Sequence, residues 1–367
     1  MSAFVEVLSL GGTIFMTEDA RGESARPDDD AGARLLAAVG GDVELRPRAL
    51  ANISSSDVRP HHLRAVLESA RAAVDSGAAG VVLTHGTDTL EETAFLLDRF
   101  WDREAPLVVT GAMRPASAPG ADGPANLRDA VRAATAPSAR GLGVLVVFDA
   151  HAHLADRVVK ASSRGVSAFA SEPSGPLAIV GAEDLRLLHL PLPRPARSGG
   201  LPPDRFPAVP LLTAGLDEDL ALLDHLPAEA LAGLVVDGVG MGHVSPAAMP
   251  RLRRLLGEGV PVVVAARPFG GGTSTHHYGY PGSEVDLLDA GAVMAGLLPA
   301  RRPACCCRCC WPPGRRPTGS VRPSRPTPPE APPPDPPRPD ARAPAAGSPR
   351  PRVRRRPGSR GRAGARR

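Results

Sequence analysis

Short apolar runs alternate with amphipathic segments along the first 300 residues. The runs lack a polar face, which predicts strands buried on both sides of a sheet. We expect such strands at residues 3–10, 80–83, 107–110 and 143–148, and a further strand, with polar residues, at 43–48. The segments between them place apolar residues at helical spacing, and helices are expected at residues 31–39, 61–74, 89–97 and 126–135. This alternation predicts an α/β fold with a doubly wound, mostly parallel sheet.

A second, smaller α/β unit follows a segment rich in Pro and Gly. That segment, residues 189–209, is typical of an interdomain linker. Beyond it, strands are expected at 210–213, 233–237 and 260–265, and helices at 217–226 and 246–256. The predicted organisation is an N-terminal domain at 1–188, the linker, a C-terminal domain at 210–300 and a tail at 301–367.

The tail differs from the rest of the chain in composition. Residues 301–367 hold 18 of the 42 Pro residues and 18 Arg, with hardly any aliphatic side chains, which predicts disorder. The tail carries a net charge of +15, so the remaining 300 residues carry −11, because the whole chain is formally +4. An acidic body argues against a large nucleic-acid footprint, and only the tail could supply one.

The cysteines and the apolar runs indicate the compartment. All five Cys lie within residues 305–310, so the first 300 residues contain no disulfide, and the CCCRCC pattern lacks the spacing of a zinc site. His151 and His153 lack further ligands at workable spacing, and we expect turn or hairpin histidines there. The sequence shows no signal peptide and no apolar run of about 20 residues. We therefore expect a cytoplasmic protein without membrane contact or a metal site.

The leading candidate site is the turn at residues 84–92, which reads THGTDTLEE. It joins a predicted buried strand to a helix with acidic residues in its first turn. Such turns at the carboxyl ends of parallel strands bind ligands, because free main-chain N–H groups point outwards there. The first predicted strand likewise ends in a glycine pair followed by Thr13, although an ordinary strand-to-loop turn is the alternative interpretation there.

Lys160 is the single Lys in a chain with 42 Arg. Arg stays protonated, whereas a desolvated Lys can lose its proton and act as a base. Thr is a poor nucleophile at neutral pH and needs such a base beside it. Thr87, Lys160 and Asp88 would form a hydroxyl, a base and an orienting carboxylate. The alternative is a surface lysine without a function.

Three sequence motifs carry a resemblance to a known family. They are residues 10–14 (LGGTI), residues 84–94 (THGTDTLEETA), and residues 111–115 (GAMRP) with 121–127 (ADGPANL). The central motif is highly specific, and the order and spacing of the three argue against coincidence. From about residue 4 to about residue 298, the chain resembles the bacterial-type L-asparaginases and their glutaminase-asparaginase relatives.

The resemblance implies an amidohydrolase that converts L-asparagine to L-aspartate and ammonia through a covalent acyl-enzyme. No cofactor is implied, and the active form would be a homodimer or homotetramer. Thr13 looks like the nucleophile, with Thr87, Asp88 and Lys160 as the activating and proton-handling set. Which threonine attacks first stays open.

The resemblance also implies substrate-binding positions. Ser55 looks like the ligand of the substrate α-carboxylate, Asp88 like that of the α-ammonium group, and Ala112 lines the pocket beside the amide. The full set of substrate-binding positions is Gly12, Ser55, Ser56, Gly86 and Ala112. A site that pairs both charges of a zwitterion rejects analogues lacking either one.

Several positions depart from the family pattern. Residues 16–30 are polar and predict a long loop that acts as a lid, yet they contain no Tyr, which the family often places there. Ser56 stands where many secreted members have Gln, and residues 240–243 stand where those members have an Asn-bearing loop. These differences favour resemblance to cytoplasmic-type members.

The start of the tail has a second interpretation in the genetic code. Read from the last base of the Ala304 codon, residues 304–312 become (Leu/Val/Met)-Leu-Leu-(Ser/Pro)-(Leu/Val/Met)-Leu-Leu-Ala. This is the aliphatic C-terminal helix expected of the family. The tail is therefore either genuine or the product of a frameshift in the gene or its sequencing.

Three functions are compatible with the sequence. The first is an L-asparaginase, and the second is an amidase of the same fold that acts on glutamine or on an amide carried by a larger partner. The third is an inactive amidase body whose Arg-rich tail binds nucleic acid.

Overall fold

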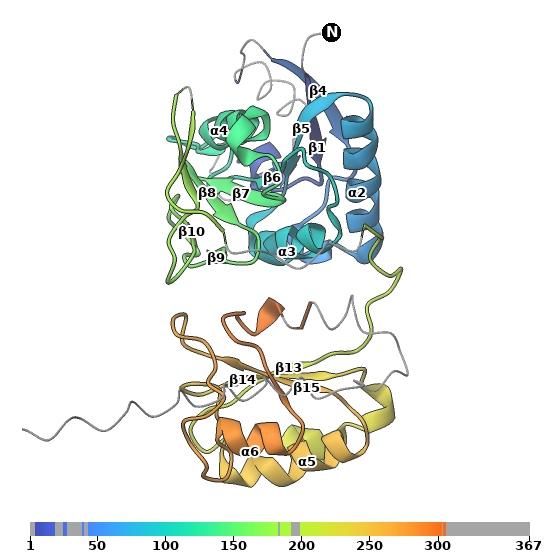
Figure 1. The fold of residues 1–367 in the computed structure, drawn as a ribbon. Coiled ribbons are helices and arrows are strands. Elements are labelled where there is room, and N and C mark those ends of the chain that lie inside the picture. Colours follow the sequence, from blue (N-terminus) through green and yellow to red (C-terminus); the bar gives the residue numbers. More distant parts are fainter. Residues whose placement is uncertain are drawn as a thin grey trace, which may run out of the picture. The chain divides into compact units, whose positions relative to one another are not determined.

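The computed structural model describes residues 4–18, 25–27, 39, 43–182, 184–191, 199–302 and 304–305 (Figure 1). The disorder predicted from residue 301 is wrong for residues 301–302 and 304–305, which are helical. From residue 306 on, the predicted tail lies outside the described residues. The predicted helix at 31–39 does so too, except for Val39, as does most of the predicted lid. In the described part of the chain, no helix is both long and apolar enough to cross a membrane.

The N-terminal sheet has eight strands in the order β12-β11-β8-β7-β6-β5-β1-β4. Strands β4, β1, β5, β6 and β7 run parallel, and β8, β11 and β12 add an antiparallel edge. The strands are β1 (Phe4–Ser9), β4 (Glu44–Ala49), β5 (Ala78–Thr84), β6 (Leu107–Thr110), β7 (Val144–Phe148), β8 (His151–Leu154), β11 (Ala178–Val180) and β12 (Leu185–Leu187).

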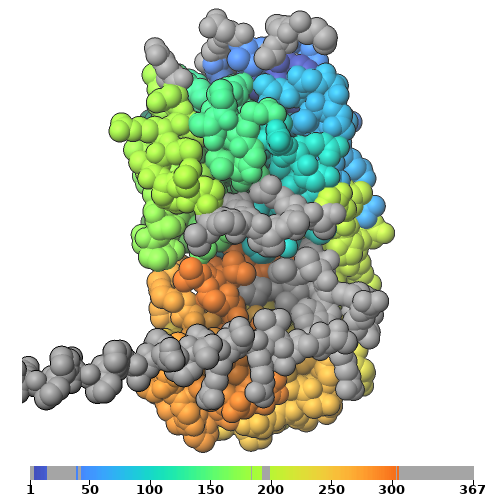
Figure 2. Space-filling model, viewed as in Figure 1, coloured from blue at the N-terminus to red at the C-terminus, as the bar shows by residue number. Residues whose placement is uncertain are grey.

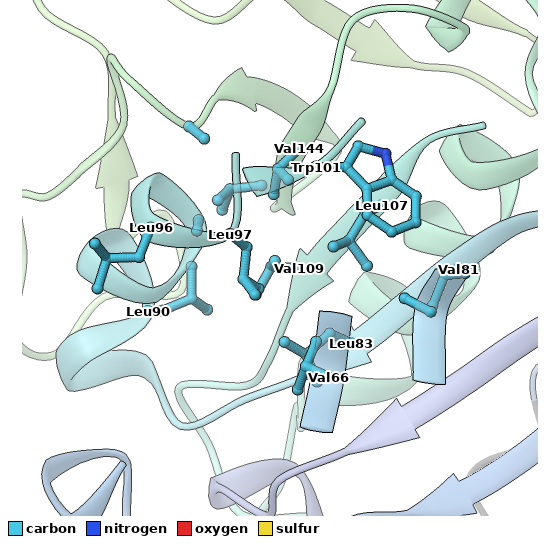
Figure 3. Close-up of a cluster of buried hydrophobic side chains, with 14 of the residues drawn as sticks. Val66, Val81, Leu83, Leu90, Leu96, Leu97, Trp101, Leu107, Val109 and Val144 are labelled. Atoms are coloured by element: carbon cyan, nitrogen blue, oxygen red, sulfur yellow. The ribbon is translucent and has the colours of Figure 1, made fainter. Parts of the chain in front are cut away.

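Helices cover both faces of this sheet, as the doubly wound prediction requires. They are α2 (Pro60–Asp75), α3 (Leu90–Phe100) and α4 (Gly123–Thr135). Successive side chains of a strand point to opposite faces, so Leu83 packs with α2 and α3 whereas Val82 packs with α4. Figure 3 shows Leu90 and Leu97 of α3 close to Leu83 and Val109 of the sheet. Helix α4 lies at the surface (green in Figure 2).

The strand order changes direction between β1 and β5. The chain runs from β1 to β4 on one side and then crosses back to β5 on the other side of β1. Loops leaving neighbouring strands in opposite directions open a crevice at their carboxyl ends, which is where open α/β sheets bind ligands. The register aligns these ends, because Ser9 lies beside Thr84 and Thr84 beside Thr110.

The C-terminal unit is a four-stranded parallel sheet in the order β13-β14-β15-β16. Its elements are β13 (Leu211–Thr213), β14 (Leu234–Gly238), α5 (Met249–Gly257), β15 (Val262–Ala266), α6 (Glu284–Asp289) and β16 (Val293–Met294). Helices α5 and α6 cover one face of the sheet, where Val236 and Val264 pack (Figure 1). On the other face, Val235 and Val263 pack with Ala300 and Ala304.

Short elements complete the description. Two small antiparallel pairs are β2 (Met16–Glu18) with β3 (Ala25–Pro27), and β9 (Val159–Lys160) with β10 (Phe169–Ala170). The 3₁₀ turns are η1 (Thr13–Phe15), η2 (Ser55–Asp57), η3 (Thr87–Thr89), η4 (Pro137–Ala139), η5 (Ala221–His225), η6 (Ala228–Ala230) and η7 (Pro246–Ala248).

Three further expectations about secondary structure need correction. Residues 16–18 and 25–27 pair as strands, so the predicted loop at 16–30 is partly regular. The predicted helix at 217–226 is only the 3₁₀ turn η5, because the Glu218 and Asp219 carboxylates accept main-chain N–H groups two residues later and Leu220 is left-handed. The antiparallel strands β11 and β12 were not predicted. The hairpin predicted at His151 and His153 is confirmed, because β8 pairs antiparallel with β7. The turn between β7 and β8 has two left-handed residues, Asp149 and Ala150, without the usual Gly.

Candidate active site

Glycines bring the loop after β1 against the turn after β5. Gly12 has a φ of +101°, and a methyl group placed on it would lie 2.6 Å from the main-chain nitrogen of Gly86. A side chain at this position is therefore excluded, and only Gly permits the approach. Thr13, which follows Gly12 and is partly exposed, starts η1 beside this contact.

A buried histidine fixes the turn that carries Thr87. His85 is fully buried, with its Nδ1 2.6 Å from the Gly86 carbonyl oxygen and its Nε2 3.1 Å from the Thr93 hydroxyl oxygen. Burial lowers the pKa of His85 to about 4, although the bond to Gly86 opposes this shift. The ring is neutral at pH 7, so Nδ1 donates its single proton to Gly86 and Nε2 accepts from Thr93. The bond to Thr93 ties the turn to α3, and the bond to Gly86 holds the turn itself.

Lys160 joins two of the predicted catalytic residues. It lies on β9, and its Nζ is 2.8 Å from the Thr87 hydroxyl oxygen and 2.6 Å from an Asp88 carboxylate oxygen. Thr87 is 7% exposed, whereas the Asp88 side chain is 73% exposed. A hydroxyl with an amine in hydrogen-bond contact, oriented by a carboxylate, has the geometry of an activated nucleophile or a proton relay.

The serine pair predicted to bind substrate divides into a buried and an exposed member. Ser55 is buried at the start of η2, and a methyl group on Gly86 would lie 3.0 Å from its Oγ. The Thr89 hydroxyl donates to the Ser55 carbonyl at 2.6 Å, which joins η2 to η3. Ser56 is exposed, and its Oγ lies 2.9 Å from that of Ser54.

Two polar side chains of the α4 start hold the loop that carries Ala112. The Asp122 carboxylate accepts the main-chain N–H groups of Met113 and Arg114, at 2.9 Å each. Asn126 donates to the Gly111 carbonyl and accepts the Asp149 N–H, both at 3.0 Å. Ala112 itself is only 1% exposed.

The predicted site residues therefore gather near the carboxyl ends of the central strands β1, β5 and β6. Thr87, Asp88 and Lys160 are in direct hydrogen-bond contact, and Gly12 and Ser55 both approach Gly86 closely. The sequence motifs also contain polar residues to which sequence reasoning gave no role, namely His85, Glu91, Asp122 and Asn126. The available signal was that all four lie within the motifs that carry the family resemblance.

Comparison with known proteins identifies the family of this chain. Residues 4–192 match the family model for the asparaginase N-terminal domain, and residues 208–304 match that for the glutaminase/asparaginase C-terminal domain. The chain belongs to the asparaginase family. Membership of this family implies a hydrolase that acts on amides.

Relatives in the asparaginase family carry different names. An L-asparaginase of Bacillus licheniformis is 31% identical over 297 residues, which covers 80% of this chain and 91% of the relative. One component of the glutamyl-tRNA(Gln) amidotransferase of Aeropyrum pernix is 28% identical over 313 residues, covering 80% and 70%. A crystal structure of a probable cytoplasmic L-asparaginase from Campylobacter jejuni matches with a TM-score of 0.71 at 27% identity, covering 83% of this chain and 93% of that one.

Proposed function

We propose that the protein is an L-asparaginase that hydrolyses L-asparagine to L-aspartate and ammonia through a threonine nucleophile and an acyl-enzyme. The observation that carries the proposal is the contact of Lys160 with Thr87 and Asp88, which follow the carboxyl end of β5 beside β1. The family and the L-asparaginase relatives support it.

The proposed reaction has two steps. A threonine Oγ bonds to the side-chain amide carbon of the substrate while its proton passes, by way of the Lys160 amine, to the amide nitrogen. The C–N bond then breaks and ammonia leaves, so that an ester joins the substrate to the enzyme. Water next attacks the ester carbon, which releases L-aspartate and restores the threonine hydroxyl.

The two threonines compete for the role of nucleophile. Family resemblance favours Thr13, whereas Thr87 has the amine of Lys160 at 2.8 Å. In the first case the Thr87 set handles protons, and in the second case Thr13 assists. Acid quenching during turnover, followed by peptide mass spectrometry, identifies the attacking residue, because the trapped ester adds the mass of the acyl group to one threonine-bearing peptide.

The proposed site recognises both charged groups of the amino acid, the α-carboxylate and the α-ammonium group. Ser55 would hold the α-carboxylate, and Asp88 the α-ammonium group. Gly12, Ser56, Gly86 and Ala112 complete the proposed substrate-binding set. Because pairing both charges is needed, succinamate, which lacks the α-ammonium group, should be turned over far more slowly than asparagine.

An amidase that acts on glutamine, or on an amide carried by a larger partner, is the second candidate. The amidotransferase component from Aeropyrum pernix, with 80% of this chain aligned, favours it. Ammonia release from free asparagine and from free glutamine, at matched concentrations, distinguishes the two. Activity on neither free amino acid would point to the larger partner.

We further expect a cytoplasmic homodimer or homotetramer that needs no cofactor. The cytoplasmic type of the Campylobacter jejuni relative supports the location. Light scattering after size-exclusion chromatography measures the oligomer, and activity after dialysis against a chelator tests the absence of a metal requirement.

The deciding experiment is a coupled ammonia assay on the wild type, Thr13→Ala, Thr87→Val and Lys160→Met. All three variants should lose turnover while retaining the wild-type far-UV circular dichroism spectrum. Equal activity of the four proteins would end the catalytic assignment.

A further inference from the structure

A buried carboxylate lies directly behind the proposed proton-handling set. Glu91 is the second residue of α3, four positions after Thr87, and is 4% exposed. One of its oxygens accepts the main-chain N–H of Lys160. The other accepts from the Arg301 guanidinium at 2.6 Å. Both oxygens are therefore engaged, and neither bond is to the reacting groups themselves.

The Lys160 N–H depends on this carboxylate. Strand β9 is only two residues long and pairs on one side with β10. The next N–H along, that of Ala161, donates across the pair to the Ala168 carbonyl at 2.7 Å. In an antiparallel pair, neighbouring N–H groups point to opposite sides, so the Lys160 N–H faces away from β10 and towards α3. Without Glu91 it would lose its acceptor there.

The two contacts of Lys160 end on one rigid segment of chain. Thr87 and Asp88 lie on η3, and Glu91 lies on α3, which continues η3 without a break. The lysine side chain has four rotatable bonds, so the position of its amine is well defined only if its main chain is also held. The Glu91 contact fixes the main chain of Lys160 relative to the same segment that its amine must reach.

We propose that Glu91 is a positioning residue that holds the Lys160 main chain, so that the amine reaches Thr87 and Asp88. The inference rests on the proposed amide hydrolysis and adds a residue that touches no reacting atom. Its loss should lower kcat, because a displaced base aligns poorly in the transition state, and should leave KM nearly unchanged.

Glu92 offers a matched control on the same helical turn. It is also largely buried, and one of its oxygens lies 3.7 Å from the Arg301 Nε. Among the described residues it forms no hydrogen bond with Lys160, and burial raises its pKa. Glu92→Ala therefore removes a buried carboxylate from the same helix while leaving the Lys160 contact in place.

The test compares the wild type, Glu91→Ala, Glu91→Gln and Glu92→Ala as full-length chains. In Glu91→Ala, kcat should fall by about 10-fold to 100-fold, with KM within about 2-fold of the wild type. Glu91→Gln should recover part of kcat, because its amide oxygen can accept the Lys160 N–H while its NH₂ group opposes Arg301. Glu92→Ala should keep kcat within about 3-fold.

Residue-level amide hydrogen exchange provides a readout that is independent of activity. The Lys160 amide should exchange faster in Glu91→Ala than in Glu92→Ala, while the Ala161 amide keeps its protection in both variants. Unchanged protection of Lys160 in Glu91→Ala, or equal kcat losses in the two alanine variants, would overturn the inference. Absence of wild-type turnover on asparagine and glutamine would instead overturn the proposed function, and the exchange result would still decide the contact.

Discussion

Among the described residues, two hydrogen-bonded strings each join a hydroxyl, a side-chain nitrogen and a carboxylate, and they differ in which member is buried. In the N-terminal unit, Thr87 is buried and the Asp88 side chain is exposed. In the C-terminal unit, the Tyr280 hydroxyl lies 2.8 Å from Nδ1 of His243, whose Nε2 lies 2.8 Å from Glu284. There the carboxylate is fully buried and the hydroxyl belongs to a half-exposed Tyr.

The difference lies in what else each carboxylate binds. Burial alone would raise the pKa of Glu284, but hydrogen bonds from the main chain of Tyr278 and His277 and from His243 lower it to about 2. These bonds tie together the loop after β14 and the segment before α6. Asp88, by contrast, contacts Lys160 and is open to solvent. A similar order of groups thus stabilises a loop in one unit and is free to interact with a ligand in the other.

The largest expected effect comes from breaking the first string. Lys160→Met should reduce kcat/KM by about 1000-fold, because the proton-transfer group is lost, with the melting temperature within a few degrees of the wild type. Lys160→Arg should not restore activity, since Arg stays protonated. The coupled ammonia assay measures both variants. An active Lys160→Arg enzyme would contradict the role of the lysine as a base.

Breaking the second string should have the opposite outcome. Glu284→Ala leaves the N–H groups of His277 and Tyr278 and the His243 ring without their acceptor, and should lower the free energy of unfolding by about 3–5 kcal/mol. Chemical denaturation measures the loss, and kcat below the unfolding transition should stay within about 3-fold of the wild type. Severe loss of kcat in a fully folded variant would show that this string serves the reaction as well.

The two units should lose stability at different pH values as the solution is acidified. Burial lowers the pKa of His85 from 6.5 to about 4, so the unfolded state binds a proton that the folded state excludes. The contribution of the neutral His85 to the free energy of unfolding is fully present above pH 6.5. It is lost as the pH falls towards 4, which lowers the free energy of unfolding by about 3 kcal/mol. The Glu284 contribution is present above pH 4.5 and is lost only as the pH falls towards 2. Unfolding free energies measured from pH 7 to pH 3 should show the histidine loss first.

His153 shares the low-pH window of His85, because burial likewise lowers its pKa to about 4. His153→Gln should therefore reduce the loss of stability between pH 6.5 and pH 4, whereas Glu284→Gln should leave that window unchanged. An identical pH dependence in His153→Gln and the wild type would contradict the assignment.

The smallest expected effect lies where the tail begins. Arg302 is 1% exposed, and both of its terminal guanidinium nitrogens lack a hydrogen-bond partner among the described residues. Burial lowers its pKa to about 10. Arg302→Leu should raise the free energy of unfolding by about 1–2 kcal/mol, because it replaces a buried guanidinium, whose terminal nitrogens form no hydrogen bond among the described residues, by an apolar side chain. Denaturant titration measures the gain, and a loss of stability would contradict it.

The C-terminal end of the family match bears on the reading-frame hypothesis. The C-terminal family match ends at residue 304, and Ala300 and Ala304 already pack on the open face of the C-terminal sheet. If the tail is genuine, the family's aliphatic helix is missing, and we expect reduced stability or aggregation. Resequencing the gene tests the hypothesis, which an uninterrupted reading frame, with relatives that share the tail, would refute.

The sequence by itself determined the sheet and the motifs. Runs without a polar face, such as residues 80–83 and 107–110, have no alternative to a buried strand, and the THGTDTLEE turn follows one of them. The single Lys also marked Lys160 as special. These features are local, because burial pattern and helix starts depend on neighbours in the chain.

Only the tertiary structure decided which residues support the site. Lys160 reaches Thr87 across 73 positions, and Glu91 holds the Lys160 main chain across 69. The failed prediction at 217–226 has a related cause, since side-chain bonds to the backbone and the left-handed Leu220 overrode local propensity. The sequence pattern indicates which side chains are buried. The hydrogen-bond partner of a buried group, however, depends on which distant segment packs against it in the folded chain, and no local pattern gives that information.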